Sequence, residues 1–262
     1  MAGEAGTLHG FRTPATPERR SRRTLLRDGA LNVVVLVWVI WLFDAINNIA
    51  PVRQHLAESN GESVLSFERS LHIDPEHALN TWLAARHTLS HIVVFWYFVI
   101  HIAVTLSVYV YLWWRRPDVL GPMRSALVIV NFAALAIFWS FPVAPLRMLP
   151  GGYVDLVSLV HHEPVWHLGA TAVESNQLCS LPSLHIAWAT WSSLGIWRAT
   201  SRRWLRVVVV VYPLITSYAV MATANHYLLD CFVGGALTLA AAWLVSCAGA
   251  LRARRRAAPQ PA

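Results

Sequence analysis

Several stretches of this chain are apolar for long enough to cross a lipid bilayer. A membrane-spanning helix needs about 20 predominantly apolar residues, and the sequence is 56% hydrophobic but only 13% charged. We predict six spans, at about 31–49, 91–114, 125–141, 184–199, 205–222 and 228–250. The expected fold class is therefore all-α, a polytopic membrane helical bundle that forms one domain over residues 31–250.

The basic residues, all of them arginine, predict how the bundle is oriented. Seventeen of the 21 arginines lie in the tails, in the 115–124 loop and in the turn around 198–206. Basic loops stay in the cytoplasm, so we expect a multi-pass protein of the cell membrane with a disordered tail (1–30) and a short basic tail (251–262) both in the cytoplasm. The net charge of +7 is then explained by topology, and no nucleic-acid partner is expected.

Two polar segments are predicted to lie outside the membrane on the opposite side. The segment 52–90 contains Asp74-Pro75, which suits a helix start with aspartate as the N-cap and proline at the first helical position. Leu79, Trp82 and Leu83 then follow at helical spacing, so this piece either lies on the membrane surface or packs against the bundle. The second segment, 142–183, is expected to be an extracytoplasmic active-site loop.

His226 and Asp230 lie four residues apart at the start of the last apolar run, so they are adjacent on one helix face. A carboxylate that accepts the Nδ1 proton of an imidazole leaves the Nε2 lone pair directed outward, which makes the histidine a nucleophile. The alternative is a polar pair that only joins helices. Ionisable groups within spans are expensive, and this favours a functional role.

Pro182-Ser183-Leu184-His185 forms a second polar cluster, at the start of the 184–199 span. We expect free backbone N–H groups of Ser183, Leu184 and His185 to point outward with the positive end of the helix dipole and to bind phosphate. His185 is then placed to protonate a leaving oxygen. Singly, Ser183 could be only an N-cap and His185 only an interfacial histidine. Both clusters on one membrane side favour a shared site.

These two motifs, set in six spans, resemble the type 2 phosphatidic acid phosphatase superfamily, and most closely its inositol phosphorylceramide synthase branch. Ala144-Pro145-Leu146-Arg147-Met148 with Gly151-Gly152-Tyr153-Val154-Asp155 is similar to the first motif of that branch, and Thr223-Ala224-Asn225-His226-Tyr227 to its third. The resemblance implies that His226 attacks phosphorus, Asp230 orients it and His185 protonates the leaving alcohol. It also implies that Arg147 and Ser183 bind the phosphate. Asn225 is expected to add to this phosphate site, and Tyr153, Asp155 and Tyr227 are candidates for the substrate pocket. No metal or other cofactor is implied.

The sequence departs from the phosphatase branch in its cations. It contains no lysine, and Val220 stands where an arginine precedes the nucleophile by six residues. Arg147 is the single obvious phosphate-binding cation, which favours a singly charged phosphodiester over a dianionic monoester. Whether water or an alcohol is the second nucleophile stays open.

Other polar residues have weaker assignments. Asp44 and His101 lie within spans and could join a substrate path, but an inward-facing pairing with Asn47 or Asn131 is the preferred interpretation. His161, His162 and His167 lack the spacing of a metal site and are expected in a loop that lines a headgroup pocket. Gly234-Gly235 permits close helix contact, and the three cysteines receive no chemical role.

Three functions follow as hypotheses. The first is a membrane phosphotransferase or phosphatase that acts on a lipid phosphate ester through phosphohistidine. The second is a non-catalytic bundle that binds or transports lipid, which the missing cations would fit. The third is an enzyme acting on another anionic lipid, such as a prenyl diphosphate.

Overall fold

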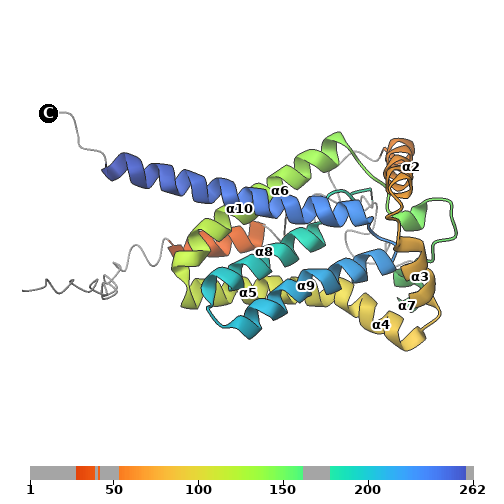
Figure 1. Cartoon of the computed structure of the whole chain (residues 1–262), viewed down its shortest axis with the longest axis horizontal. Coiled ribbons are helices and arrows are strands. Elements are labelled where there is room, and N and C mark those ends of the chain that lie inside the picture. Colours follow the sequence, from red (N-terminus) through yellow and green to blue (C-terminus); the bar gives the residue numbers. More distant parts are fainter. Residues whose placement is uncertain (1–27, 39–40, 42–52, 162–177, 258–262) are drawn as a thin grey trace, which may run out of the picture.

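The computed structural model describes residues 28–38, 41, 53–161 and 178–257. Apart from one isolated β-bridge between Val143 and Cys179, these residues form helices and loops. The predicted all-α membrane bundle is thus confirmed (Figure 1). After a helix at Asp28–Trp38 come α2 (Gln54–Ser70), α3 (Glu76–Ala84), α4 (His87–Phe95), a π-helical turn (Trp96–Ile100), α5 (His101–Arg115), α6 (Pro117–Ser140), a 3₁₀ turn (Leu146–Met148), α7 (Leu156–His161), α8 (Leu184–Ala199), α9 (Arg203–Ala222) and α10 (Leu228–Ala257).

Four continuous helical segments among the described residues are long and apolar enough to cross a membrane: His87–Arg115, Pro117–Ser140, Arg203–Ala222 and Leu228–Arg256. They correspond to the predicted second, third, fifth and sixth spans. The predicted fourth span is the 16-residue helix α8. The predicted first span is described only in part, and Asp44 and Asn47 within it lie outside the described residues.

Helix α8 forms the centre of the bundle and packs against α5, α6, α9 and α10. Its apolar side chains point in all directions, which is the pattern of a helix surrounded by others. Trp191 is fully buried and donates a hydrogen bond from its indole nitrogen to the Met123 carbonyl, at 2.7 Å. Most of its 16 residues are covered by protein, while Trp197 and Arg198 in its last turn are exposed.

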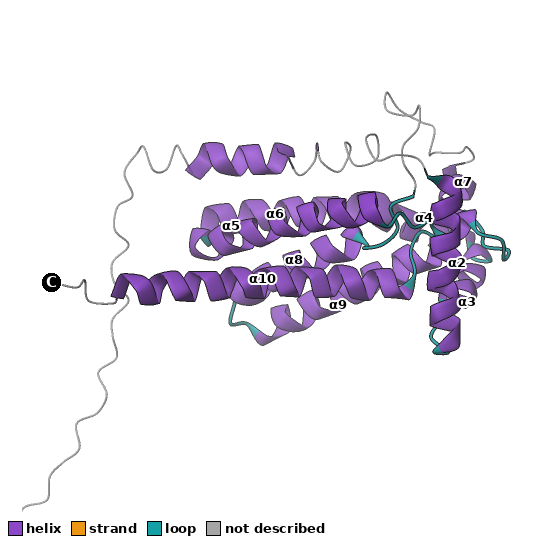
Figure 2. Ribbon diagram, turned by 90° about the horizontal axis from the view of Figure 1, so that it is seen from above, coloured by secondary structure: helices purple, strands orange, loops and turns teal. Residues whose placement is uncertain are grey.

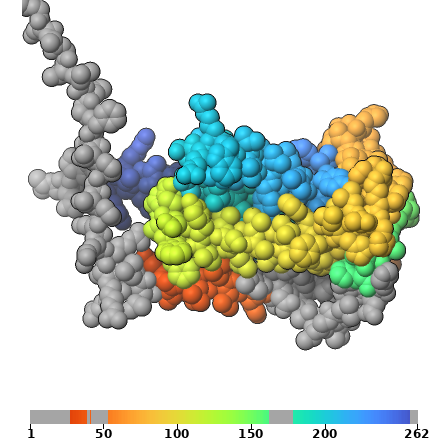
Figure 3. All heavy atoms as spheres, turned by 90° about the horizontal axis from the view of Figure 1, so that it is seen from below, coloured from red at the N-terminus to blue at the C-terminus, as the bar shows by residue number. Residues whose placement is uncertain are grey.

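The outer helices expose large apolar side chains, as expected for surfaces in contact with lipid. On α9, Val207, Val210 and Leu214 are more than half exposed, and Phe232 and Trp243 on α10 are similar. Figure 3 views one such side, where α9 lies beside the long band formed by α4 and α5. Exposed apolar surface of this extent is explained by a lipid environment.

Helices α2, α3 and α7 gather at one end of the bundle and lie across its axis (Figure 2). The opposite end carries the arginine-rich junctions, where α5 ends at Arg115, α9 begins at Arg203 and α10 ends beyond Arg256. The arginine-rich loops and the two other polar segments therefore lie at opposite ends of the bundle, as the sequence predicts.

Helix α3 packs against α9, which answers the question left open for segment 52–90. The predicted aspartate N-cap is wrong: the helix begins at Glu76 after Pro75 without a side-chain cap, and Asp74 instead pairs with Arg69, at 3.5 Å. The buried face is also more polar than expected, because Glu76 and Asn80 are buried with Leu83 while Trp82 is exposed. The two polar side chains tolerate burial because both bind backbone groups.

Candidate active site

The turn between α9 and α10 holds His226 in place through its backbone. The amide nitrogens of Asn225 and His226 both donate to the Val220 carbonyl, at 3.1 and 3.2 Å. Ala224 has a positive φ of 57°, a conformation that is uncommon for residues other than glycine, and the Arg147 amide donates to its carbonyl, at 2.9 Å. The turn is therefore fixed both by its own chain and by the loop that carries Arg147.

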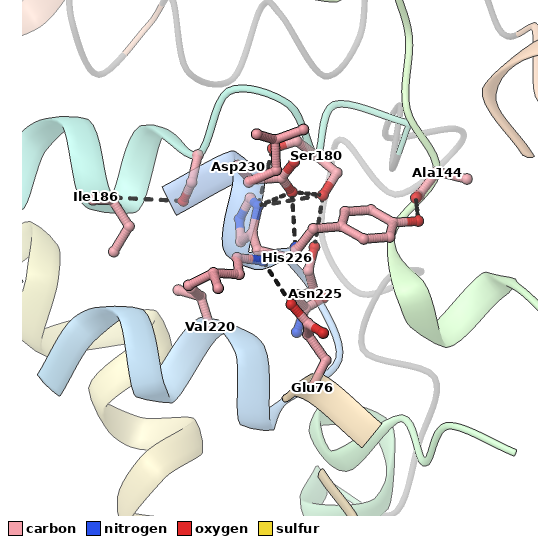
Figure 4. A network of polar contacts seen from close by, with 12 residues as sticks. Glu76, Ala144, Ser180, Ile186, Val220, Asn225, His226 and Asp230 are labelled. Atoms are coloured by element: carbon pink, nitrogen blue, oxygen red, sulfur yellow. Dashed lines mark hydrogen bonds and ion pairs between the residues drawn. The ribbon is translucent and has the colours of Figure 1, made fainter. Parts of the chain in front are cut away.

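The imidazole of His226 is oriented by partners at Nδ1. The Ser180 carbonyl oxygen lies 2.9 Å from this atom and Asp230 Oδ2 lies 3.2 Å from it (Figure 4). A carbonyl oxygen can only accept, so we assign the proton to Nδ1 and the lone pair to Nε2. The predicted His226–Asp230 contact is thus present, with a backbone carbonyl as a second and closer acceptor.

Ser180 is a member of the site that sequence reasoning missed. Its hydroxyl forms a short hydrogen bond to Asp230 Oδ2 and lies 3.0 Å from the Asn225 carbonyl. The Tyr227 amide also donates to Oδ2 of Asp230, at 3.0 Å. Asp230 is fully buried, so these donors compensate the loss of water around its carboxylate.

His185 lies beside His226 at the first turn of α8. The ring centroids are 5.4 Å apart and the rings meet edge to face. Tyr97 stacks on His185 at 4.5 Å, and His101 lies 4.3 Å from it on another side. The two histidines that the sequence separates by about forty residues therefore share one location, as predicted.

The π-helical turn Trp96–Ile100 directly precedes His101 and contains Tyr97. Such turns are frequent at functional sites because they reorient the side chains around them. His101 is buried against His185 and Trp188, whereas the side-chain amide of Asn131 donates to the Leu127 carbonyl. The simpler assignment of His101 as a partner of Asn131 is thus not what the structure shows.

Ser183 is the N-cap of α8, and its hydroxyl accepts from the Ile186 amide, at 3.5 Å. The prediction that its own amide is free for phosphate is wrong, because that N–H donates to the Asp230 carbonyl, at 3.2 Å. The contact instead joins the two polar clusters directly, from the start of α8 to the first turn of α10.

Arg147 is linked to the two histidines by shared neighbours: it binds Asn225, which precedes His226, and it interacts with Tyr97, which stacks on His185. Its Nη1 donates to Asn225 Oδ1 at 2.6 Å, and its Nε lies 3.7 Å from Asp155 Oδ2. Burial lowers the pKa of the guanidinium, while interactions with Tyr97 and Asp155 oppose this effect. A buried arginine next to the residue before His226 is suitably placed to bind an anion.

The other residues predicted to line the substrate pocket make contacts away from the two histidines. Tyr227 is fully buried and donates from its hydroxyl to the Ala144 carbonyl, at 2.8 Å, which turns it away from His226. Tyr153 meets His77 edge to face, with centroids 5.4 Å apart. Asp155 caps α7 through the Ser158 amide in addition to its contact with Arg147.

Two glutamates that sequence reasoning did not select also reach this region. Glu68 of α2 accepts from the Leu229 amide at 2.6 Å, and Glu76 of α3 accepts from the Leu228 amide at 2.7 Å. Figure 4 shows Glu76 below His226 at the start of α10. Both side chains belong to helices outside the bundle, so their position depends on the tertiary fold.

The histidines of the 142–183 loop are described only in part. His161 ends α7 and meets Phe98 edge to face at 5.9 Å, while His162 and His167 lie outside the described residues. Among the residues described, histidine, cysteine and acidic side chains form no cluster suited to a metal ion.

A family model matches a large part of the sequence. The model of the PAP2 superfamily matches residues 62–244, which is more than half of the chain and includes both histidines. The chain therefore belongs to the PAP2 superfamily, whose members are generally phosphatases or phosphotransferases acting on lipid phosphate esters. Comparisons with curated proteins and with solved structures gave no match.

Proposed function

We propose that this protein is a membrane phosphotransferase or phosphatase that acts on a lipid phosphate ester through a phosphohistidine at His226. Membership of the PAP2 superfamily supports the class of reaction. The observation that carries the proposal is the geometry of His226: Nδ1 faces the Ser180 carbonyl and Asp230, and the second histidine lies 5.4 Å away. One phosphoryl group between the rings could contact both.

The reaction proceeds in two displacements. In the first, Nε2 of His226 attacks phosphorus, the bond from phosphorus to the leaving alcohol breaks, and His185 gives its proton to the leaving oxygen. In the second, His185 takes a proton from the acceptor hydroxyl, the acceptor oxygen attacks phosphorus, and the electron pair of the P–N bond returns to Nε2. The negative charge of Asp230 stabilises the imidazolium-like state of His226 in both steps.

Arg147 and Asn225 are proposed to hold the phosphate oxygens, together with the Ser183 hydroxyl and the N-terminus of α8. Among the described residues around His226, Arg147 is the cation we assign to the phosphate; its side chain is 5% exposed, and part of its charge is already balanced by Asp155, at 3.7 Å. A phosphodiester carries one charge, so it matches this site better than a monoester dianion does. This choice agrees with the sequence resemblance to inositol phosphorylceramide synthases, in which a phosphoryl headgroup is transferred to an alcohol.

We place the site on the extracytoplasmic side of a cell membrane. The arginine-rich junctions lie at the opposite end of the bundle from the turn between α9 and α10, which carries His226, and arginine-rich loops stay in the cytoplasm. The substrate would then be drawn from the outer leaflet, and the acceptor, water or an alcohol, would approach from the extracytoplasmic side.

Trapping the covalent intermediate tests the proposal. Purified protein is mixed with lipids labelled at phosphorus, quenched and analysed for label that survives base but is lost in acid, which is the behaviour of a phosphorus–nitrogen bond. The wild type and His55→Ala, which removes an exposed histidine of α2, are expected to acquire label. His226→Ala is expected to acquire none.

The same experiment separates the alternatives. A lipid-binding or transporting bundle would bind the lipid equally well in wild type and His226→Ala and would label in neither. An enzyme for prenyl diphosphates would be labelled by those lipids and by no phosphodiester. Label on His226→Ala equal to that on the wild type would refute the phosphohistidine.

A further inference from the structure

We propose that Glu68 and Glu76 share one proton and act together as a positioning device for the nucleophile, by holding the first turn of α10. This pair, called the carboxyl pair below, touches neither histidine, so its members are positioning residues. The inference rests on the proposed function for its catalytic consequence, but its structural basis is independent of the reaction.

The carboxyl pair accepts hydrogen bonds from two successive backbone N–H groups at the start of α10. Leu228 donates to Glu76 at 2.7 Å and Leu229 donates to Glu68 at 2.6 Å. The first amides of a helix have no partner within the helix and lie at the positive end of its dipole, so carboxylates stabilise them. Both glutamates are fully buried, which makes these contacts inaccessible to water.

The shared proton is inferred from the carboxyl oxygens that do not bind α10. Oε2 of each glutamate is buried and has no hydrogen-bond donor among the described residues, while the two carboxyls interact with each other. Two adjacent buried carboxylates cannot both stay ionised at moderate cost. One proton between them turns one carboxyl into a donor and leaves a single negative charge facing the helix dipole.

The electrostatics of the pair agree with this arrangement. Burial raises the pKa of Glu68 to about 8, with further increases from Glu76 and Asp230, and burial also raises the pKa of Glu76. The titratable and charged groups that interact with the pair from neighbouring elements are Asp74, Tyr153, Tyr227, Asp230 and Cys231. None of these groups is a cation, and Arg69, the cation next to Glu68 in α2, pairs with Asp74 and interacts with Tyr153. We therefore assign a proton as the counter-charge of the pair.

The first turn of α10 connects the pair to the chemistry. Leu228 and Leu229 lie between His226 and Asp230, and the Asp230 carbonyl accepts from the amide of Ser183 at the start of α8. A displacement of this turn would move Asp230 away from Nδ1 of His226. Loss of the shared proton would place two negative charges beside Asp230 and displace the turn in this way.

Glutamine substitutions test the sharing of the proton. In Glu68→Gln or Glu76→Gln, the amide oxygen can accept from α10 and the amide N–H can donate to the remaining carboxylate, so one permanent donor replaces the proton. We expect each single variant to keep kcat within about threefold of the wild type. The double variant places two amide donors against each other, and kcat should fall about tenfold or more, the effect of leaving buried polar groups unsatisfied. Glu62→Gln, on the exposed face of α2, is the control.

Thermal melting at different pH values tests the pair without any reaction. Because the folded pKa of Glu68 is raised from its ordinary 4.5 to about 8, its protonated form stabilises the fold. That stability is full below the ordinary pKa and is lost as the pH rises through the folded pKa. The wild type and Glu62→Gln should therefore lose melting temperature between about pH 5 and pH 8. The melting temperatures of Glu68→Gln and Glu76→Gln should fall less than that of the wild type over the same pH range.

The outcomes distinguish the two proposals. A double glutamine variant as active and as stable as the singles, or a single variant with the same pH dependence of melting as the wild type, would overturn the carboxyl pair. If no lipid phosphate is turned over by the wild type, the proposed function fails, while the melting curves still decide the protonation of the pair.

Discussion

Ser180 offers the sharpest test of the site at the scale of a single residue. Its hydroxyl binds Asp230 Oδ2, while its backbone carbonyl accepts from His226 Nδ1. Ser180→Ala removes only the first of these, so a buried carboxylate loses a donor and the imidazole keeps its tautomer. We expect kcat to fall about tenfold to a hundredfold, the effect of losing a hydrogen bond to a charged group, with KM nearly unchanged. Steady-state kinetics on a lipid phosphate measure both constants.

The control for this substitution is Ser63→Ala, because the Ser63 hydroxyl donates to the Ser59 carbonyl within the exposed side of α2. Asp230→Asn should show a larger loss of kcat than Ser180→Ala and sets the upper limit for comparison, since it removes the negative charge that faces Nδ1 of His226. An increase in KM with unchanged kcat in Ser180→Ala would contradict the assignment, because it would mean that Ser180 acts on substrate binding.

The residues of the site differ in how visible they are in the sequence. His226 and Asp230 could be predicted because helical spacing alone makes them neighbours, and His185 because it begins an apolar run. Ser180, Glu68 and Glu76 could not, because their contacts with α10 depend on how a loop and two surface helices are placed by the tertiary fold. Serine and glutamate are also common in polar segments, so their presence in 52–90 and 142–183 carries little information.

At the scale of helices, the contact between α8 and α10 depends on Gly234. A Cβ at this position would overlap the Ser183 backbone carbonyl, which a rigid helix end cannot move aside. Gly234→Ala should therefore destabilise the fold by about 1–3 kcal/mol, as overpacking does, and should reduce activity by separating Ser183 from Asp230. Thermal unfolding in detergent and lipid turnover measure the two effects.

Two glycines of the same helix serve as matched controls. A Cβ at Gly235 would meet Thr190 Oγ1 at 3.6 Å, an ordinary contact, and a Cβ at Gly249 would meet nothing within 4 Å. Because alanine is favoured over glycine in a helix by up to about 1 kcal/mol, Gly249→Ala should leave stability unchanged or increase it. Equal losses in Gly234→Ala and Gly249→Ala would refute the proposed contact.

Hydropathy predicted some helix starts and missed others, and α10 begins at the predicted residue, Leu228. α8 was predicted with its observed first and last residues, Leu184 and Ala199. In contrast, α6 begins at Pro117, eight residues before the predicted start, and the second span begins at His87 instead of 91. The polar residues that begin these helices lower the local hydropathy, although proline at the first helical position suits a helix start.

At the scale of the whole molecule, the orientation in the membrane is a testable prediction. Single cysteines can be introduced at Ser59 on α2 and at Ser201 in the α8–α9 turn, both exposed, after Cys179, Cys231 and Cys247 are replaced by serine. With a membrane-impermeant maleimide on intact cells, we expect Ser59→Cys to react and Ser201→Cys to react only after the cells are opened. The reverse pattern would place the site in the cytoplasm.

The carboxyl pair has a consequence for how the protein is made. Glu76 and Glu68 bind amides that lie 152 and 161 positions later in the chain. Both glutamates are therefore synthesised long before the backbone amides that they bind. Until residues 226–229 have been synthesised, a nascent chain has neither His226 nor the amides of Leu228 and Leu229 that the two glutamates bind. On the proposed mechanism, an enzyme under synthesis cannot modify the lipids around it, and a product truncated before residue 226 is inert.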